Sequence, residues 1–388
     1  MVMDVLSRRR LLVAGGASAL VAGIGAPLAY HSAPLTLARA PWDDAQSAFE
    51  DPRLGALAYA ILAPNPHNLQ PWSFQLVGGD TVDVLCARAD RLPETDPFDR
   101  QITIGFGCLI ELFRLAAEAL GYRTEITPFP DGPGGDRLSL GRVARLRLIA
   151  DNSLTPDPLF AHALTRRSNK APFEDRAVST DLVLALTSTP GCAFPASGAV
   201  DAETVAGLRD LTWQAWMAEY AHEATRKESI DLMRIGNRAI NRTPDGIDLG
   251  GAAMGAMNMV GLVTHRALNS PGSTAYASGI DMYDRIINTA AGYVWLTTPG
   301  NSRRQQLQAG ADWLRLNLAA TSLGLAFHPL SQILQEADIF SALKKQVYAR
   351  LGAKDGETVQ MLVRLGFAAR EAPAPRWPLR AKLIDAPA

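Results

Sequence analysis

The chain has 388 residues, of which 47% are hydrophobic and 20% charged, with a formal net charge of −1. At roughly 100–200 residues per domain, this length suits two domains. The near-neutral balance gives no basic footprint, so nucleic acid is excluded as an expected partner. The three cysteines, at 86, 108 and 192, have no C-x-x-C spacing and suggest neither a zinc site nor a disulfide framework, and we expect no bound metal.

The N-terminus has the layout of an export signal. Ser7-Arg8-Arg9-Arg10-Leu11-Leu12 precedes a Gly- and Ala-rich apolar stretch that runs to about Ala29. The paired arginines resemble a twin-arginine signal, so we expect residues 1–40 to be a signal or anchor and the protein to be exported, periplasmic or anchored on the periplasmic side. A membrane-spanning helix is the alternative, although the stretch is barely long enough. Ala38-Arg39-Ala40 suits cleavage but Pro41 would hinder it, so an uncleaved anchor stays open as the one membrane contact.

The first half, residues 41–156, alternates helical and strand patterns. A helix that includes Leu57 and Ile61 is predicted to end before Pro64, because proline cannot occupy a helix interior. A hairpin follows, with strands at 74–77 and 82–85 around Gly78-Gly79-Asp80. A long apolar helix over 102–120 and a strand over 143–149 come next, and the polar segment 151–158 marks a domain boundary.

The second half, residues 157–388, repeats this plan with an insertion. We expect helices from Leu182, over 202–227 and over 309–323, and a strand over 359–366. The segment 229–301 is rich in Gly, Met and Ala and has no counterpart in the first half. The helix ends Phe113–Gly121 and Leu316–Gly324 share the pattern L-A-A-x-x-L-G, which is compatible with an internal repeat.

The segment Ala63-Pro64-Asn65-Pro66-His67-Asn68-Leu69-Gln70-Pro71-Trp72 suits the edge of a flavin ring. Its prolines stiffen the loop before a ligand binds, and the carboxamides of Asn65 and Asn68 can both donate and accept hydrogen bonds. On composition alone, a proline-rich turn capped by Asn and packed by Trp72 is the favoured interpretation.

The segment Thr165-Arg166-Arg167-Ser168-Asn169-Lys170 carries three cations and two hydroxyls within six residues. Arginine binds phosphate oxygens with two parallel hydrogen bonds, and lysine adds a point charge, so the segment suits a phosphomonoester. A solvated basic run is the alternative interpretation.

Taken together, these segments resemble the nitroreductase-like FMN proteins. The family's R-R-S-x-R/K-x-F run is approached at 166–172, with the aromatic residue one place late at Phe173. Its P-S-x-x-N-x-Q-P-W run is matched at 64–72, with Asn65 in place of the serine. Its closing helix and loop are matched from Gly310-Ala311 through Gly324-Leu325 to Pro329, and its tail by Arg376-Trp377-Pro378-Leu379.

The order of the motifs differs from that of an ordinary member, because the Asn-Gln-Pro-Trp element precedes the Arg-Arg-Ser element by about a hundred residues. Ordinary members are homodimers in which each FMN uses both subunits. The resemblance therefore implies an α+β chain with two tandem nitroreductase-like α/β domains, fused as a pseudo-dimer of the two-domain Acg type. In place of an Arg-Arg-Ser segment that binds the phosphate (a phosphate clamp), the first half has the acidic residues 49–53. In place of an Asn-Gln-Pro-Trp loop at the flavin ring (a ring loop), the second half has residues 189–195. One FMN site per chain is expected, with the second site lost.

The resemblance implies roles by position. Arg166, Arg167, Ser168 and Lys170 would hold the phosphate and ribityl chain, with Arg376 closing over the phosphate. The residues expected at the flavin ring are Pro64, Asn65, Asn68, Pro329, Leu330 and Ser331. His67 and His328 are candidates for proton donation, although such histidines more often hydrogen-bond their own loop.

The implied function is an FMN-dependent oxidoreductase of the nitroreductase type, which passes electrons to a nitroaromatic, quinone or similar small aromatic acceptor. The alternative is an FMN storage protein without efficient NAD(P)H-dependent turnover. The insertion, with its Met and Gly residues, is expected to form a lid over the flavin. The chain shows no G-x-G-x-x-G after a strand, hence no dinucleotide fold of its own. Because the usual dimer interface would be internal, we expect a monomer.

Overall fold

The structure, a computed structural model, describes residues 34–86 and 91–384. The twin-arginine motif and apolar stretch lie outside these residues. Helix α2 (Thr36–Asp44) begins the described body, and its Ala38 is fully buried. The predicted signal boundary at residue 40 falls inside this helix, so the folded part begins at least as early as Thr36. Within the described residues, no helix has the length and hydropathy needed to cross a bilayer.

The first half forms a four-stranded antiparallel sheet in the order β1-β2-β4-β3. Its strands are β1 (Trp72–Val77), β2 (Thr81–Cys86), β3 (Tyr122–Pro128) and β4 (Arg142–Ala150). The helices α3 (Pro52–Ala60) and α4 (Arg100–Ala119) pack on it. The predicted hairpin, long helix and last strand are confirmed, whereas β3 was not predicted because most of its side chains are exposed.

The second half forms a sheet with the corresponding order, β5-β8-β10-β9. Its strands are β5 (Ala196–Ala199), β8 (Gly292–Thr298), β9 (Ala326–Pro329) and β10 (Thr358–Gly366), and its helices include α5 (Thr180–Thr187), α12 (Arg303–Ser322) and α13 (Ser341–Leu351). In both halves a long helix, α4 or α12, stands between the second and third strands of the sequence. The two halves therefore share one topology.

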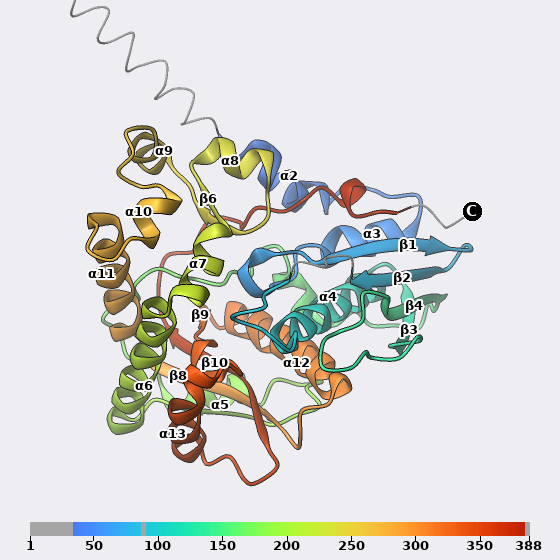
Figure 1. Cartoon of the computed structure of the whole chain (residues 1–388). Coiled ribbons are helices and arrows are strands. Elements are labelled where there is room, and N and C mark those ends of the chain that lie inside the picture. The colour runs from blue at the N-terminus through green and yellow to red at the C-terminus, as the bar shows by residue number, and fades with distance from the viewer. Residues whose placement is uncertain (1–33, 87–90, 385–388) are drawn as a thin grey trace, which may run out of the picture.

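The helices α4 and α12 pack against each other in the middle of the molecule (Figure 1). They are buried almost all round because each touches its own sheet and the other helix, and one hydrophobic core joins both halves. The contact is closest at two glycines. A Cβ added to Gly107 would lie 1.9 Å from the Leu307 carbonyl oxygen, and one added to Gly310 would lie 2.0 Å from that of Ile104. Each glycine thus faces a carbonyl three residues before the other glycine, which indicates a local two-fold relation between the helices.

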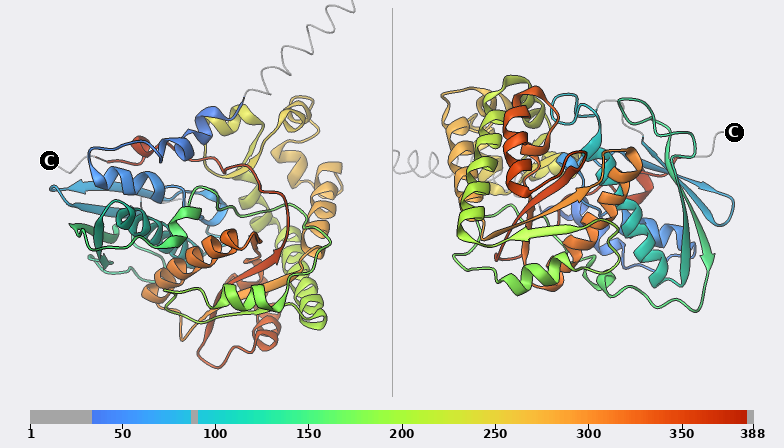
Figure 2. Two further views of the ribbon diagram at one scale, coloured as in Figure 1. Left: turned by 180° about the vertical axis from the view of Figure 1, so that it is seen from behind. Right: turned by 90° about the horizontal axis from the view of Figure 1, so that it is seen from below.

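The insertion in the second half runs between β5 and β8. It contains α6 (Ala202–Ala221), α7 (Glu223–Asp231), β6 (Met233–Ile235), α8 (Asn237–Arg242), β7 (Ile247–Leu249), α9 (Ala252–Met259), α10 (His265–Asn269) and α11 (Thr274–Asn288). The single helix predicted over 202–227 is broken at His222, whose backbone is extended. The predicted range 229–301 omits α6 and includes β8, which is a core strand because both of its faces are covered. Figure 2 shows α6 and α13 beside the second sheet, whereas α8 packs on α2.

Candidate functional site

The loop between α3 and β1 holds a strained conformation. His67, Asn68 and Gln70 have φ angles of 50°, 53° and 51°, a region that residues other than glycine rarely adopt. The carboxamide oxygen of Asn65 accepts a hydrogen bond from the Gln70 amide at 2.8 Å. The buried Gln70 side chain donates to the Pro244 carbonyl at 2.7 Å and accepts from the Trp377 amide at 2.9 Å. The insertion and the C-terminal segment therefore hold this loop in place.

The carboxamides of Asn65 and Asn68 are engaged inside the protein. Asn65 donates to the Ala63 carbonyl at 3.2 Å, besides accepting from Gln70. Asn68 donates to the Pro375 carbonyl at 3.1 Å and accepts from the Arg376 guanidinium at 2.6 Å. These two side chains thus shape the loop in this structure, and their expected contact with a flavin ring stays a prediction. Pro64 is half-buried at the start of the loop.

The Arg376 side chain, which the resemblance places over the phosphate, is bonded within the protein in this structure. Its guanidinium donates to the carbonyls of Ile61, Leu62 and Ala63 at 2.9 to 3.0 Å and to Asn68 and Pro375. The three carbonyls follow the C-terminus of α3, where unpaired acceptors attract a cation. All five N–H groups are thereby used. Burial, with nearby Arg166, lowers the pKa of Arg376 to about 9.

The three segments selected from the sequence meet in space. The Asn169 amide donates to the Phe327 carbonyl at 3.0 Å, which joins 165–170 to β9. Arg166 of the second half donates to the Leu62 carbonyl of the first half at 3.0 Å. The charge of Lys170 lowers the pKa of both His67 and His328, so it lies near each ring. The loop 64–70, the segment 165–170 and the end of β9 therefore form one site.

A cluster of arginines lies on one side of this site, comprising Arg39, Arg166, Arg167, Arg370 and Arg376. Burial, followed by neighbouring arginines, lowers the pKa of Arg166 and of Arg167 to about 10. The Arg167 guanidinium stacks 4.6 Å from the centre of the Trp42 ring. Among the described residues, none of the five forms an ion pair with a carboxylate. Uncompensated cations at this density favour binding of an anion.

Two members of the arginine cluster were not predicted. Arg39 was assigned to the export signal, yet it lies in α2 and donates to the Pro373 carbonyl at 2.9 Å. Arg370 is exposed in the tail and acts on the pKa of Arg167. The buried Trp42, three residues after Arg39 on the same helix, was the available sign that this segment is folded. Ser168 is half-buried beside Arg167.

The two histidines are uncharged at neutral pH. His67 Nε2 lies 3.1 Å from the Ser229 hydroxyl, and burial, with Lys170, lowers its pKa to about 4. His328 Nδ1 accepts a hydrogen bond from Arg364 Nε at 2.9 Å, and burial, then Arg364 and Lys170, hold its pKa well below 6.5. The proton of the His328 ring is therefore on Nε2. Neither imidazole can serve as a charged proton donor at neutral pH, and each is bonded to another element rather than to its own loop.

The end of β9 presents a mixture of free and engaged groups. The Leu330 amide donates to the Leu362 carbonyl at 2.9 Å, so it is not available to a ligand. The Ser331 hydroxyl lies 3.9 Å from the Met361 sulfur, and Pro329 pairs with Val363 in the sheet. Pro329 and Ser331 are half-buried and remain the parts of this segment that can line the site.

Three buried side chains at the site have polar atoms without a partner. These are Nδ1 of His67, Nε of Arg166 and both amide atoms of Asn317. Asn317 lies one helical turn beyond Trp313, whose ring is 4.7 Å from that of Phe327 in β9. Buried polar groups without partners are rare in folded proteins, and a polar ligand bound beside these three side chains would supply the missing partners. Asn317 has no counterpart among the residues predicted from sequence.

Comparison with known proteins finds a relative that is named as a nitroreductase. No family profile matches the chain. It is 26% identical over 328 residues to a Mycobacterium tuberculosis protein named "Putative NAD(P)H nitroreductase", with 84% of this chain and 88% of that protein covered. A second protein of that organism, uncharacterised, is 30% identical over 122 residues, covering 31% of this chain and 35% of its own length.

Two solved structures are similar at a lower level. One is the FMN-dependent nitroreductase NfnB from Mycobacterium smegmatis in complex with NADPH, with a TM-score of 0.34, 16% identity and coverage of 57% of this chain and 96% of that one. The other is a nitroreductase with bound FMN from Bacteroides fragilis, with a TM-score of 0.32, 14% identity and coverage of 56% and 91%. The sequence similarity to the protein named as a nitroreductase thus spans most of both chains.

Proposed function

We propose that this chain binds one FMN between its two halves and acts as a nitroreductase-type oxidoreductase. The observation that carries the proposal is the meeting of Arg166, from the second half, with the loop at Leu62, from the first half. Arg39, Arg166 and Arg167 would hold the phosphate, while His67, Lys170 and Asn317 would face the ring system. Bound FMN would supply the redox chemistry, by accepting electrons from a donor and passing them to a nitroaromatic, quinone or similar acceptor.

The arrangement of the halves supports the fused pseudo-dimer that the sequence suggests. Both sheets have the corresponding strand order, and α4 and α12 touch through reciprocal glycine contacts. In the first half, the residues that correspond to the clamp include Asp51, which pairs with Arg53 at 2.7 Å instead of leaving a free cation. We therefore propose a single FMN site per chain and a monomer in solution.

Flavin stoichiometry tests the composite site. Full-length protein, saturated with FMN and passed through gel filtration, is expected to retain one FMN per chain by absorbance. Two retained FMN per chain would contradict the loss of the second site, and none after saturation would contradict the proposal as a whole. Sedimentation velocity of the same sample tests whether the protein is a monomer in solution.

The storage alternative is favoured by the contacts of the insertion. Ser229 lies against His67, the Gly246 amide donates to the Asn68 carbonyl at 3.1 Å, and Pro244 accepts from Gln70. The insertion is thus bonded to the ring loop, which supports its assignment as a lid. A lid of this kind would restrict access by a nicotinamide donor.

Anaerobic reduction of the bound flavin distinguishes an NAD(P)H-dependent enzyme from an FMN storage protein. We expect NADH or NADPH to bleach the flavin absorbance within seconds if the protein is an NAD(P)H-dependent enzyme. Dithionite should bleach it in either case and controls for the presence of reducible flavin. Absence of bleaching by both nicotinamides, with bleaching by dithionite, would favour storage.

Export remains part of the proposal because Arg8-Arg9 and the apolar stretch resemble a twin-arginine signal. Fractionation of cells that express the full chain should recover it outside the cytoplasm, in the periplasmic or the membrane fraction. Replacement of Arg8 and Arg9 by lysines should retain it in the cytoplasm, and unchanged export would contradict this assignment.

A further inference from the structure

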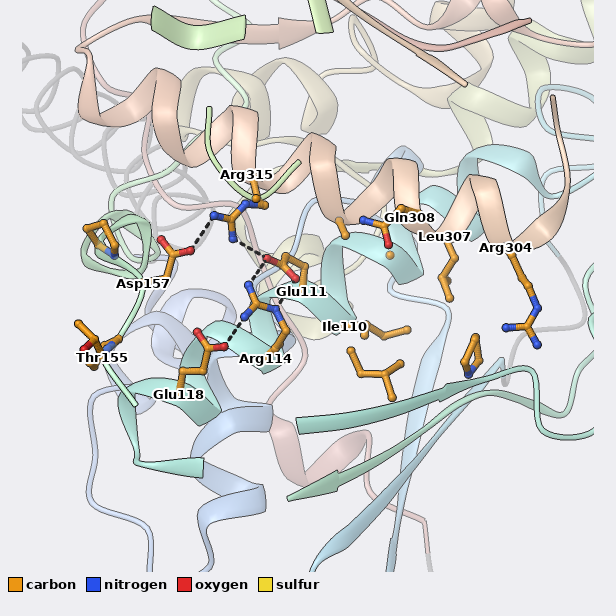
Figure 3. Close-up of a pocket in the computed structure, with 17 residues that line it drawn as sticks. Ile110, Glu111, Arg114, Glu118, Thr155, Asp157, Arg304, Leu307, Gln308 and Arg315 are labelled. Carbon is orange, nitrogen blue, oxygen red and sulfur yellow. Dashed lines mark hydrogen bonds and ion pairs between the residues drawn. The ribbon is translucent and has the colours of Figure 1, made fainter. Parts of the chain in front are cut away.

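A cavity of about 860 Å³ opens between α4 and α12 at a place that the flavin proposal does not use. Its walls come from both helices, from the end of β3, from residues 155–158 and from Gly191 (Figure 3). This volume lies within the range of roughly 300–1,000 Å³ that is usual for small-molecule sites.

The repeated topology relates this cavity to the proposed flavin site. Pro128 ends β3 as Pro329 ends β9, and Gly191 lies in the connection from α5 to β5, which corresponds to the ring loop between α3 and β1. The cavity therefore occupies the position that a second ligand would take in a symmetric pair of domains.

One end of the cavity is closed by two arginines and three carboxylates that pair with one another, which leaves one negative charge in excess. Arg315 pairs with Glu111 at 2.9 Å and with Asp157 at 2.7 Å, and donates to the Pro190 carbonyl at 2.9 Å. Arg114 pairs with Glu111 at 2.6 Å and also with Glu118. Because each arginine here already has carboxylate partners, this end offers no unpaired cation for a phosphate. A second FMN is thereby disfavoured.

The opposite end carries an unpaired cation. Arg304 is exposed and lines the cavity, and among the described residues it forms no ion pair with a carboxylate. Figure 3 shows it at the far end from the Arg114 and Arg315 network, with Ile110 and Leu307 between. The remaining wall is largely apolar, with Ile126, Pro128 and Ala311.

We propose that this cavity binds an aromatic anion, with its ring system against the apolar wall and its carboxylate or sulfonate at Arg304. Apolar surface supplies most of the binding free energy in such a site, and the cation orients the ligand. The site is separate from the flavin and does not depend on the arginine cluster around Arg166.

Calorimetric titration of flavin-loaded, full-length protein with 2-naphthoate tests this site. We expect saturable binding of one naphthoate per chain, and at least about tenfold weaker binding in Arg304→Glu, because attraction becomes repulsion. Arg285→Glu is the matched control, since this exposed residue of α11 undergoes the same charge change away from the cavity. Its affinity should match that of the unchanged protein.

A second variant removes the space rather than the charge. Gln308 is exposed and lines the cavity, so Gln308→Trp should abolish naphthoate binding while the flavin stoichiometry stays unchanged. The proposal would be overturned if the unchanged protein did not bind naphthoate. It would also be overturned if Arg304→Glu and Gln308→Trp both bound naphthoate as tightly as the unchanged protein. Circular dichroism of each variant confirms that the fold is retained.

Discussion

Five arginines gather at the proposed phosphate position, but their side chains differ in what they can still bind. Arg166 retains an unpartnered buried Nε, whereas every N–H of Arg376 is already used. Arg166→Ala combined with Arg167→Ala should weaken FMN retention roughly 100-fold or more, because charge-assisted hydrogen bonds to the phosphate are lost. Equilibrium dialysis measures the affinity. Arg285→Ala is the control, and an unchanged affinity in the double variant would contradict the clamp.

Arg376 should behave differently when it is replaced. Arg376→Lys keeps the charge but loses most of the hydrogen bonds to the carbonyls after α3, so we expect the flavin-free protein to lose roughly 1.5–3 kcal/mol of unfolding free energy. Urea unfolding of flavin-free protein measures this loss. If the stability of the flavin-free protein were unchanged and only FMN affinity fell, Arg376 would bind the phosphate after all.

The buried histidines make stability depend on pH. Above pH 6.5 they are uncharged in both the folded and the unfolded chain. Between pH 6.5 and about 4 the unfolded chain binds a proton at His67 that the folded chain does not bind, so stability falls by up to about 1.4 kcal/mol per pH unit. The lowered pKa of His328 acts in the same direction. Urea midpoints across this range should show a shallower fall in His67→Gln. An identical slope would mean that His67 is not held uncharged.

The residue types and the family resemblance together predicted which segments meet at the proposed site, but not how each side chain is used. Arg166 and Lys170 were found because cations were concentrated within a few residues. The engagement of Asn65, Asn68 and Arg376 depends on carbonyls at the end of α3 and in the tail, which come together only in the folded chain. Asn317 was not predicted, because a single carboxamide in an otherwise apolar helix does not by itself indicate a binding residue.

The contact between α4 and α12 gives a prediction at the scale of elements. Gly310→Ala places a methyl group 2.0 Å from the Ile104 carbonyl oxygen, so the helices must separate. We expect a loss of unfolding free energy of about 1–3 kcal/mol, the usual cost of overpacking, or more because backbone must move. Urea unfolding measures it. Gly135→Ala is the matched control, since nothing lies within 4 Å of its added Cβ, and equal stability of the two variants would contradict this helix contact.

Periodic patterns predicted the long helices and the hairpin well, because their apolar spacing is strong. They failed where an element is defined by its partners. The strand β8 was placed in the insertion because its segment follows a long Gly-rich region, yet it pairs with both β5 and β10. The edge strand β3 lacks an apolar face, so its sequence does not differ from that of a loop.

At the scale of the whole molecule, the C-terminal segment joins distant parts of the chain. The Phe74 amide donates to the Lys382 carbonyl at 2.7 Å, and the Arg376 amide donates to the Ala38 carbonyl at 2.8 Å. A chain that ends after Glu371 should therefore lose FMN retention as well as stability, whereas one that ends after Ile384 should keep both. Retention of FMN by the shorter chain, measured after gel filtration, would contradict this role.

Arg376 is separated by 313 residues from Ala63, the nearest in sequence of the three carbonyl acceptors after α3. During synthesis the loop leaves the ribosome long before the side chain that fixes it has been translated. The loop therefore lacks these hydrogen bonds until Arg376 has left the ribosome. Cofactor loading is consequently expected to follow translation of Arg376, and a nascent chain stalled before Pro375 should take up no flavin.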